Sequence, residues 1–251
     1  MTSRYAQGFT ILECLLVVGI LGLLIGVLLP VMRGLKEDAW DADCKAHLRQ
    51  MAQVCTAFAQ STGEYPWGMK NVSGYSSYCW DFKRPNGGKD EPGDMWEGLN
   101  FGSVVCCPKC RDTFDNWNGG GYTGYNYNCA YVGKVVGDRA TRESPLRWMQ
   151  VKQADKLPLF GDGGYSGGPN KFMRATQASR DWDYSGDSLR EAGTQAFRHK
   201  GHANISFADG HVESCHRPYT TSGKEGWVSE KAKTAFVGEN NDFYGKMALG
   251  L

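Results

Sequence analysis

The strongest constraint on this chain of 251 residues is one apolar stretch near its start. Residues 14–29 are all apolar or glycine, and between positions 9 and 29 only Thr10 and Glu13 are polar. A helix of that length rises about 30 Å, the thickness of the hydrocarbon core of a bilayer. The whole chain carries 28 Lys and Arg against 27 Asp and Glu, which gives no general attraction to nucleic acid. The sequence therefore predicts one membrane-spanning helix followed by a water-soluble head.

Glu13 is the unusual residue of this segment. Even by the lowest estimates, which come from membrane-insertion experiments, a carboxylate inside the apolar core of a membrane costs about 2.5–3.5 kcal/mol. Such a residue is usually present because a partner neutralises it. A cleaved secretory signal does not fit, because the apolar run is followed by Leu-Leu-Pro-Val-Met-Arg rather than by small residues at a cleavage site.

Residues 4–13 read Arg-Tyr-Ala-Gln-Gly-Phe-Thr-Ile-Leu-Glu. This stretch closely resembles the prepilin leader of type IV pilins and type II secretion pseudopilins. The resemblance implies that residues 1–8 are a leader, that a peptidase cuts after Gly8, and that the new N-terminal Phe9 is methylated. It also implies that Glu13, the fifth mature residue, steers assembly, and Pro30 stands where many pilins carry proline. The membrane helix would then be residues 9–29, anchored in the bacterial inner membrane by a single pass.

Assembly has a simple electrostatic reason under this interpretation. When subunits stack, Glu13 of one subunit can pair with the Phe9 amine of its neighbour, so two costly charges become one pair. The expected function is a structural, non-enzymatic subunit of a pilus or pseudopilus, with its head in the periplasm or on an extracellular filament. Its expected partners are the prepilin peptidase and methyltransferase, other subunits and the inner membrane, with no nucleic acid. The alternative is a membrane-anchored periplasmic binding or metal-dependent protein that does not polymerise.

The helix is expected to continue through residues 30–62. Its apolar positions 40, 44, 48, 51, 55 and 58 form a stripe on one helical face, and Gly63 is a candidate C-cap. Residues 63–251 are expected to form a β-rich head, so that the fold is α+β, with the helix packed on a small antiparallel sheet. We expect strands over 103–106, 157–160, 203–208 and 211–213, and a short helix over 228–236.

The sharpest local signal in the head is a hairpin. Two short alternating runs, 203–208 and 211–213, are joined by Asp209 and Gly210. An Asp-Gly pair between such runs predicts a tight turn in which both residues have positive φ.

His199 precedes Asp209 with nine residues between them. This spacing resembles the H-X9-DG element of a large family of prepilin-processed proteins, and the resemblance implies architecture and processing pathway rather than an activity. The residues of this hairpin motif, within 199–213, are His199, Asn204, Asp209, Gly210 and His211.

A metal or catalytic site is a weaker interpretation of the same region. His199, Asp209, His211 and Asp162 have side chains that suit a divalent ion, and Asp162 beside a Gly-rich loop would also suit calcium. Asp209, however, is fully explained as a turn residue, so a structural role is favoured. The expected subunit needs no cofactor, and zinc or calcium is the alternative.

The nine cysteines divide into three groups. Cys14 lies in the membrane segment, while Cys44 and Cys55 lie on the helical stripe, about 16 Å apart along the axis, and are expected to be buried small hydrophobes. Cys107 and Cys110 form a C-x-x-C pair, half of a zinc knuckle that Cys106, Cys129 or Cys79 would complete. Disulfides are favoured over zinc in an extracytoplasmic head. The other head cysteines are Cys79, Cys106, Cys129 and Cys215.

Overall fold

The computed structural model describes residues 10–99, 104–110, 124–135, 144–164, 171–173, 194–216, 234–235, 243, 245 and 247–250. The chain divides into two compact units, Met1–Ala39 and Trp40–Leu251. Gly8 and Phe9 of the predicted leader junction lie outside the described residues.

The first long element, α1, is an uninterrupted α-helix over Ile11–Thr62. It continues through Pro30, as the sequence predicts, and ends at Gly63, whose φ of +85° is favourable for glycine alone. The amide of Gly63 donates to the Ala59 carbonyl at 2.9 Å. The first part of α1 is long and apolar enough to cross a membrane, and none of its most apolar window is buried in the structure.

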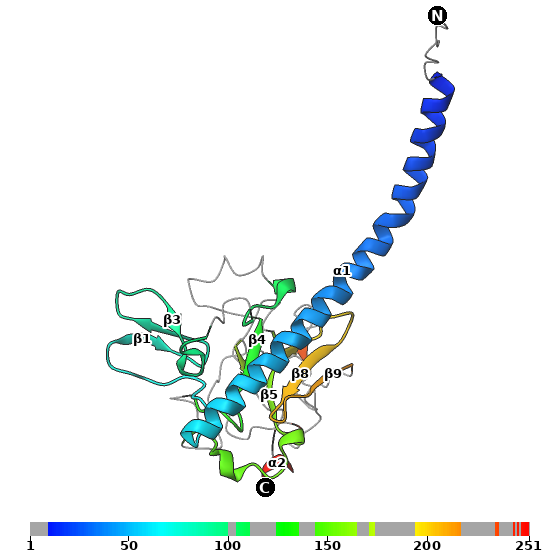
Figure 1. Cartoon of the computed structure of the whole chain (residues 1–251). Helices are drawn as coiled ribbons and strands as arrows, with labels where there is room; N and C mark the ends of the chain where they lie inside the picture. Colours follow the sequence, from blue (N-terminus) through cyan, green and yellow to red (C-terminus); the bar gives the residue numbers. More distant parts are fainter. Residues whose placement is uncertain are drawn as a thin grey trace, which may run out of the picture. The chain divides into compact units, whose positions relative to one another are not determined.

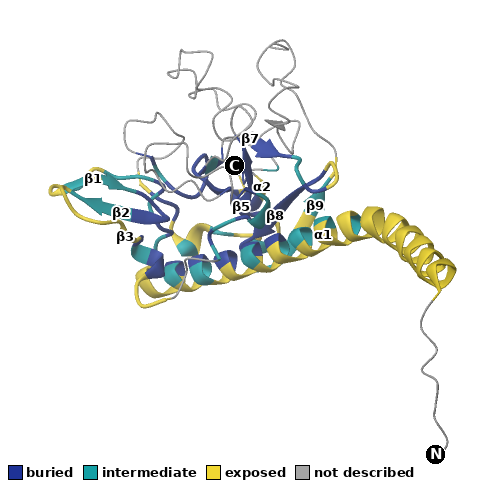
Figure 2. Ribbon diagram, turned by 90° about the horizontal axis from the view of Figure 1, so that it is seen from above, coloured by how far each residue is buried: buried dark blue, intermediate teal, exposed yellow. Residues whose placement is uncertain are grey.

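In the second unit, one face of α1 belongs to the core. Figure 2 shows the buried residues of this half on the side that faces the strands, with exposed residues opposite. The buried positions follow the predicted stripe, while Trp40 and Phe58 are partly buried. They are Cys44, Leu48, Met51, Ala52, Cys55 and Ala59. The expected core-facing helix is therefore confirmed.

The head contains two sheets (Figure 1). The smaller is antiparallel in the order β1-β2-β3, and the larger has seven strands in the order β10-β7-β5-β4-β6, with β8 paired to β5 and β9 paired to β8. The strands of the two sheets are β1 (Tyr75–Tyr78), β2 (Phe82–Pro85), β3 (Glu91–Pro92), β4 (Tyr125–Asn128), β5 (Pro158–Gly164), β6 (Phe172–Met173), β7 (Thr194–Ala196), β8 (Ala203–Phe207), β9 (Val212–Cys215) and β10 (Thr234–Ala235).

Short helical turns complete the described head: η1 (Asp94–Trp96), η3 (Trp148–Gln150), η4 (Ala154–Lys156) and α2 (Met247–Leu249). The centre of the larger sheet is β5, which pairs with β4, β7 and β8 and is buried along its whole length. Figure 1 shows the second half of α1 passing across β4, β5 and β8. One direct link is the Thr56 hydroxyl, which donates to the Ala208 carbonyl at 3.0 Å.

The α+β layout agrees with the sequence, but three details differ. The larger sheet is mixed rather than antiparallel, because β4 and β6 run parallel. Residues 104–106, expected in a strand, form a turn. Residues 234 and 235, expected in a helix, pair instead with β7 as the strand β10, since a non-local sheet edge outweighs local helix preference. The remainder of 228–236 lies outside the described residues.

Candidate functional site

The predicted hairpin is present as β8 and β9, but its turn differs from the expected one. Gly210 has a φ of +92°, whereas Asp209 is not among the described non-glycine residues with positive φ. The amide of Gly210 donates to the Phe207 carbonyl at 2.9 Å, and the amide of Phe207 donates to the His211 carbonyl at 3.0 Å. This pattern is a three-residue connection in which only the last residue is left-handed, so the expectation of two positive φ values was wrong.

Asp209 and His211 act within this turn. The Asp209 carboxylate accepts from the His211 amide at 3.1 Å and lies 2.6 Å from His211 Nδ1. His211 also stacks on the Phe207 ring, with centroids 4.3 Å apart. Both polar side chains are partly exposed and pair with each other, which agrees with the structural interpretation of Asp209.

His199 and Asn204, in contrast, are buried and face α1 and β5. Asn204 donates from its amide nitrogen Nδ2 to Asp41 Oδ1 at 2.8 Å and from its backbone to Asp162 Oδ2 at 2.7 Å. His202 Nε2 also lies 2.8 Å from Asp41 Oδ1. The H-X9-DG segment is thereby attached to the helix through one carboxylate, Asp41.

The Asp41 carboxylate is held in its charged form. Burial opposes this, but hydrogen bonds from Lys45, Asn204 and His202 outweigh it and lower the pKa of Asp41 to about 2. The Lys45 bond is 2.7 Å long and lies along the helix, four residues on. Asp41 was not singled out by its sequence, because nothing local distinguishes it from the other acidic residues of α1.

Four buried side chains converge beside this carboxylate. Their donor atoms all lie within 4.8 Å of one another, and each residue is fully buried. Cys44 Sγ lies 3.2 Å from Cys107 Sγ, Cys107 Sγ lies 4.0 Å from His199 Nε2, and His199 Nε2 lies 3.6 Å from Asp162 Oδ1. We call Cys44, Cys107, Asp162 and His199 the thiol–histidine cluster.

One member comes from α1 and three come from different parts of the head. Cys44 lies on α1, Cys107 in the described segment 104–110, Asp162 on β5, and His199 in the turn before β8. The sequence groups His199 with Asp162 and marks Cys107 as a candidate ligand, whereas it predicts only a packing role for Cys44. The sequence feature that could have identified Cys44 as a ligand is its position on the buried stripe, because the stripe directs its thiol into the head.

The electrostatics of the cluster favour the thiolate form of Cys107. Hydrogen bonds with Cys110 and then with Cys44 lower the pKa of Cys107 well below its usual value, although burial opposes this. The same bonds, together with burial, raise the pKa values of Cys44 and Cys110. Burial lowers the pKa of His199, but Asp162 and Cys107 outweigh it and raise the pKa to about 9.

Cys110 and Arg198 lie immediately outside the cluster. Arg198 Nη1 donates to Cys110 Sγ at 2.7 Å, and its Nη2 lies 3.8 Å from Asp162 Oδ1. Arg198 also donates to the carbonyls of Gly124 and Gly163. A buried cation is thus fixed beside the buried carboxylate of Asp162.

The remaining cysteines do not join the cluster. The three residues expected to complete the C-x-x-C half-site, Cys79, Cys106 and Cys129, lie elsewhere, and Asp162, His199 and Cys44 take that place. No disulfide joins any of the nine cysteines in the structure, so the expected preference for disulfides is not realised in it.

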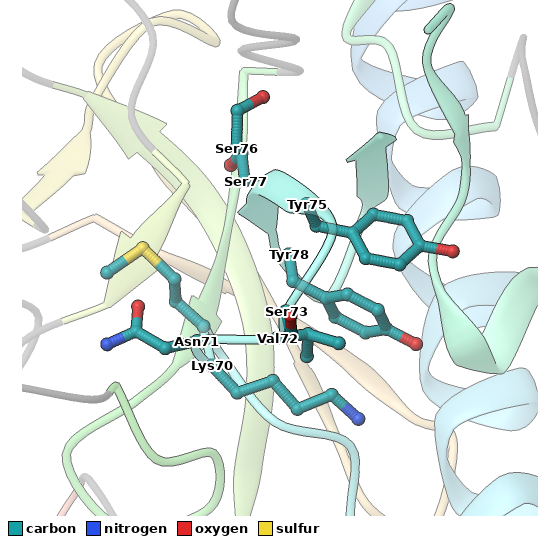
Figure 3. Close-up of a pocket in the computed structure, with 9 residues that line it drawn as sticks. Lys70, Asn71, Val72, Ser73, Tyr75, Ser76, Ser77 and Tyr78 are labelled. Atoms are coloured by element: carbon teal, nitrogen blue, oxygen red, sulfur yellow. The ribbon is translucent and has the colours of Figure 1, made fainter. Parts of the chain in front are cut away.

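A second candidate is an open hollow of about 410 Å³ formed by residues 69–73 and 75–78 (Figure 3). The rings of Tyr75 and Tyr78 meet edge to face there, with centroids 5.1 Å apart, and Lys70 Nζ lies 4.4 Å above the Tyr78 ring. The Lys70 ammonium is already paired with Asp94 at 3.1 Å. One short chain segment lines the hollow, and it brings together no group with an obvious chemical task, so the thiol–histidine cluster is the stronger candidate.

Comparison of the chain with protein-family models, curated proteins and solved structures finds no match. The fold and the site define an α+β protein with one N-terminal helix that is long and apolar enough to span a membrane, and with a head that encloses a buried thiol–histidine cluster.

Proposed function

We propose that the chain is a structural subunit of a type IV pilus-like filament or a type II secretion pseudopilus. In this proposal a prepilin peptidase cuts after Gly8 in the bacterial inner membrane and Phe9 is methylated. Glu13 then pairs with the Phe9 amine of a neighbouring subunit. The apolar part of α1 forms the filament core, and the head lies in the periplasm or on the outside of the filament.

The observation that supports this proposal is the division of α1 into two chemically different parts. Between Ile11 and Met32 the helix is exposed and carries a single charged residue, Glu13. The same helix continues without a break into a part whose buried face belongs to the core of the head. A simple membrane anchor needs neither the carboxylate nor a helix that continues into the head, whereas a filament core of packed helices uses both.

Glu13 has a second possible role, which the experiment must separate from assembly. At the start of α1 its carboxylate accepts from the Thr10 amide at 2.8 Å and from the Thr10 hydroxyl at 2.9 Å. The Glu13 amide donates back to the Thr10 hydroxyl at 3.3 Å, which completes a capping box. Glutamine serves equally well at that position of a capping box.

The substitution Glu13→Gln therefore keeps the cap and removes the charge. If Glu13 neutralises a neighbour's amine, its loss leaves that amine unpaired at a cost of about 2.5–3.5 kcal/mol, so sheared filaments should fall about tenfold or more. Membrane insertion should be unchanged. The control Thr10→Ala removes the cap and keeps the charge, and it should assemble. Normal assembly of Glu13→Gln would contradict the proposal.

Processing is tested separately by the mass of the N-terminal peptide of the protein isolated from membranes. The proposal expects a peptide that begins with methylated Phe9. An intact peptide that begins at Met1 would show that the leader is not used, and would favour the anchored, non-polymerising alternative.

The thiol–histidine cluster bears on that alternative. It supports metal binding, but its four side chains are fully buried and come from four segments of the head. A catalytic metal keeps one coordination position open to substrate, whereas a structural site is closed. The burial of this cluster therefore favours a structural role, which is compatible with a filament subunit.

A further inference from the structure

We propose that Cys44, Cys107, Asp162 and His199 bind one zinc ion in a closed tetrahedral site that fastens α1 to the head. This inference is independent of filament assembly, because the site would form in a single subunit. It rests on the types of the donor atoms, their spacing, two unsatisfied buried atoms and the groups that orient the ligands.

The donor spacing is that of a zinc tetrahedron. Zinc–sulfur bonds of about 2.3 Å and zinc–nitrogen or zinc–oxygen bonds of about 2.0–2.2 Å place neighbouring ligands about 3.3–3.8 Å apart. The three measured separations around the cluster are 3.2, 4.0 and 3.6 Å. All four ligand atoms lie within 4.8 Å of one another, so small side-chain movements bring them to one centre.

Two buried polar atoms of the cluster are otherwise left without a hydrogen bond. Asp162 Oδ1 and His199 Nδ1 both lack a hydrogen-bond partner and have only longer ion-pair contacts, although both side chains are fully buried. A buried carboxylate oxygen without a hydrogen bond is unfavourable, because it has lost its interactions with water and gained none in the protein. Zinc bound between Asp162 Oδ1 and His199 Nε2 removes the deficit at the carboxylate and fixes the histidine tautomer.

The groups around the ligands are those that support a metal. His199 Nδ1 faces Asp41 Oδ1 at 3.9 Å, so a small rotation of the ring gives the carboxylate–histidine–metal arrangement that is common at zinc sites. The second oxygen of Asp162 is held by the Asn204 amide at 2.7 Å. Arg198 supplies a positive charge next to Asp162. Two thiolates, one carboxylate, one zinc ion and this arginine then sum to zero charge.

The donor set also selects the ion. Thiolate and imidazole ligands favour zinc, whereas calcium requires six to eight oxygen ligands. The calcium site that the sequence suggests at Asp162 is therefore not supported, because the groups around Asp162 include two thiols and an imidazole. A Cys44–Cys107 disulfide is the competing outcome, but it would leave Asp162 Oδ1 and His199 unsatisfied.

The test uses the full chain in detergent, reduced, exposed to Zn²⁺ or Co²⁺ and then desalted. The proposal expects about one ion per chain, with Co²⁺ giving the visible bands of a tetrahedral site and a thiolate-to-cobalt charge-transfer band. This readout needs no variant. Retention of no ion, or a cobalt spectrum without thiolate ligation, would overturn the proposal.

Variants then assign the ligands. Cys107→Ser and His199→Gln should each weaken zinc retention about tenfold or more. The matched control is Cys55→Ser, because Cys55 is as fully buried as Cys107 but lies outside the cluster. Equal retention by all three variants would overturn the assignment.

A thiol count on the native, unreduced protein tests the competing outcome. The proposal expects all nine thiols to be free after unfolding in a chelator. A count of seven free thiols, together with a disulfide-linked peptide pair that contains Cys44 and Cys107, would show that the site is a disulfide instead.

Discussion

The attachment of the H-X9-DG segment to α1 can be measured directly at Asp41 and Asn204. The Asn204 side chain donates to Asp41 Oδ1 at 2.8 Å, and His202 and Lys45 complete the carboxylate's partners. A hydrogen bond to a charged group contributes about 1.5–3 kcal/mol, and more is lost when one buried partner is left alone. We therefore expect Asp41→Ala to lower the free energy of unfolding by about 3 kcal/mol.

A double-mutant cycle isolates the shared bond. Asp41→Ala, Asn204→Ala and the double variant should show a coupling free energy of about 1–2 kcal/mol, because the second substitution removes a bond that the first has already broken. The loss of the Ser214–Asn204 bond occurs in both branches of the cycle and cancels. Lys45→Ala is the control: its ion pair with Asp41 is partly solvent-exposed on the lysine side, so it should cost about 0.5 kcal/mol or less.

The assay is urea unfolding of the full chain in detergent micelles, followed by tryptophan fluorescence. Trp80 and Trp96 are almost fully buried, so their emission reports the head. A coupling below about 0.5 kcal/mol would mean that the two sites act independently. The structural explanation of Asn204 in the H-X9-DG element would then be refuted.

Two further predictions use the same assay. Leu48→Ala, in the buried stripe of α1, should lower the free energy of unfolding by about 3 kcal/mol and the melting temperature of the head by about 6–12 °C. Leu16→Ala, in the exposed apolar part, should leave both unchanged, and equal effects of the two variants would refute the division of the helix. Asp94→Asn should cost about 0.5–1 kcal/mol at neutral pH, because the pKa of Asp94 is lowered by the Tyr78 hydroxyl and by Lys70, which outweigh burial. A lowered folded-state pKa gives stability that is complete above the unfolded value of about 4 and is lost as the pH falls, so the difference between wild type and Asp94→Asn should shrink between about pH 6 and pH 3. A difference that stays constant over this range would contradict the assignment.

The sequence predicted the elements that local periodicity determines. Each of these elements is encoded within one short segment: the long apolar run at residues 9–29, the stripe from Cys44 to Cys55 and the Asp209-Gly210 turn. The structure contains a helix, a buried helical face and a hairpin at these places. The turn type was missed because one left-handed glycine is enough when the connection has three residues.

The cluster could be predicted only in part, since its members are far apart in the sequence. The positions 44, 107, 162 and 199 come together through the packing of α1 on the sheet, and no local pattern encodes that packing. His199 and Asp162 were grouped because their side chains suit a metal. Cys44 was assigned to the core, and its burial is consistent with both roles.

The placement of these contacts on α1 has a mechanical consequence if the filament proposal holds. The boundary between the two compact units lies between Ala39 and Trp40, and both Asp41 and Cys44 follow within the next helical turns. Beyond them, the buried face from Leu48 to Ala59 is apolar apart from the thiol of Cys55. The helix therefore meets its charged contacts and the cluster thiol first, and its later contacts are apolar apart from Cys55 and the hydrogen bond from Thr56 to Ala208.

Tension along α1 would load Asp41 and Cys44 before it reached Leu48. Local opening is cheap where few contacts hold a segment, so the contacts of Asp41 and Cys44 would limit how firmly the helix is held to the head. A zinc ion at Cys44 would bind only the closed form and would raise the free energy of that opening by mass action. Chelation should consequently speed amide hydrogen exchange at residues 41–47 more than at 52–59. Equal protection in both segments, with and without zinc, would place the strength of the junction in the apolar stripe alone.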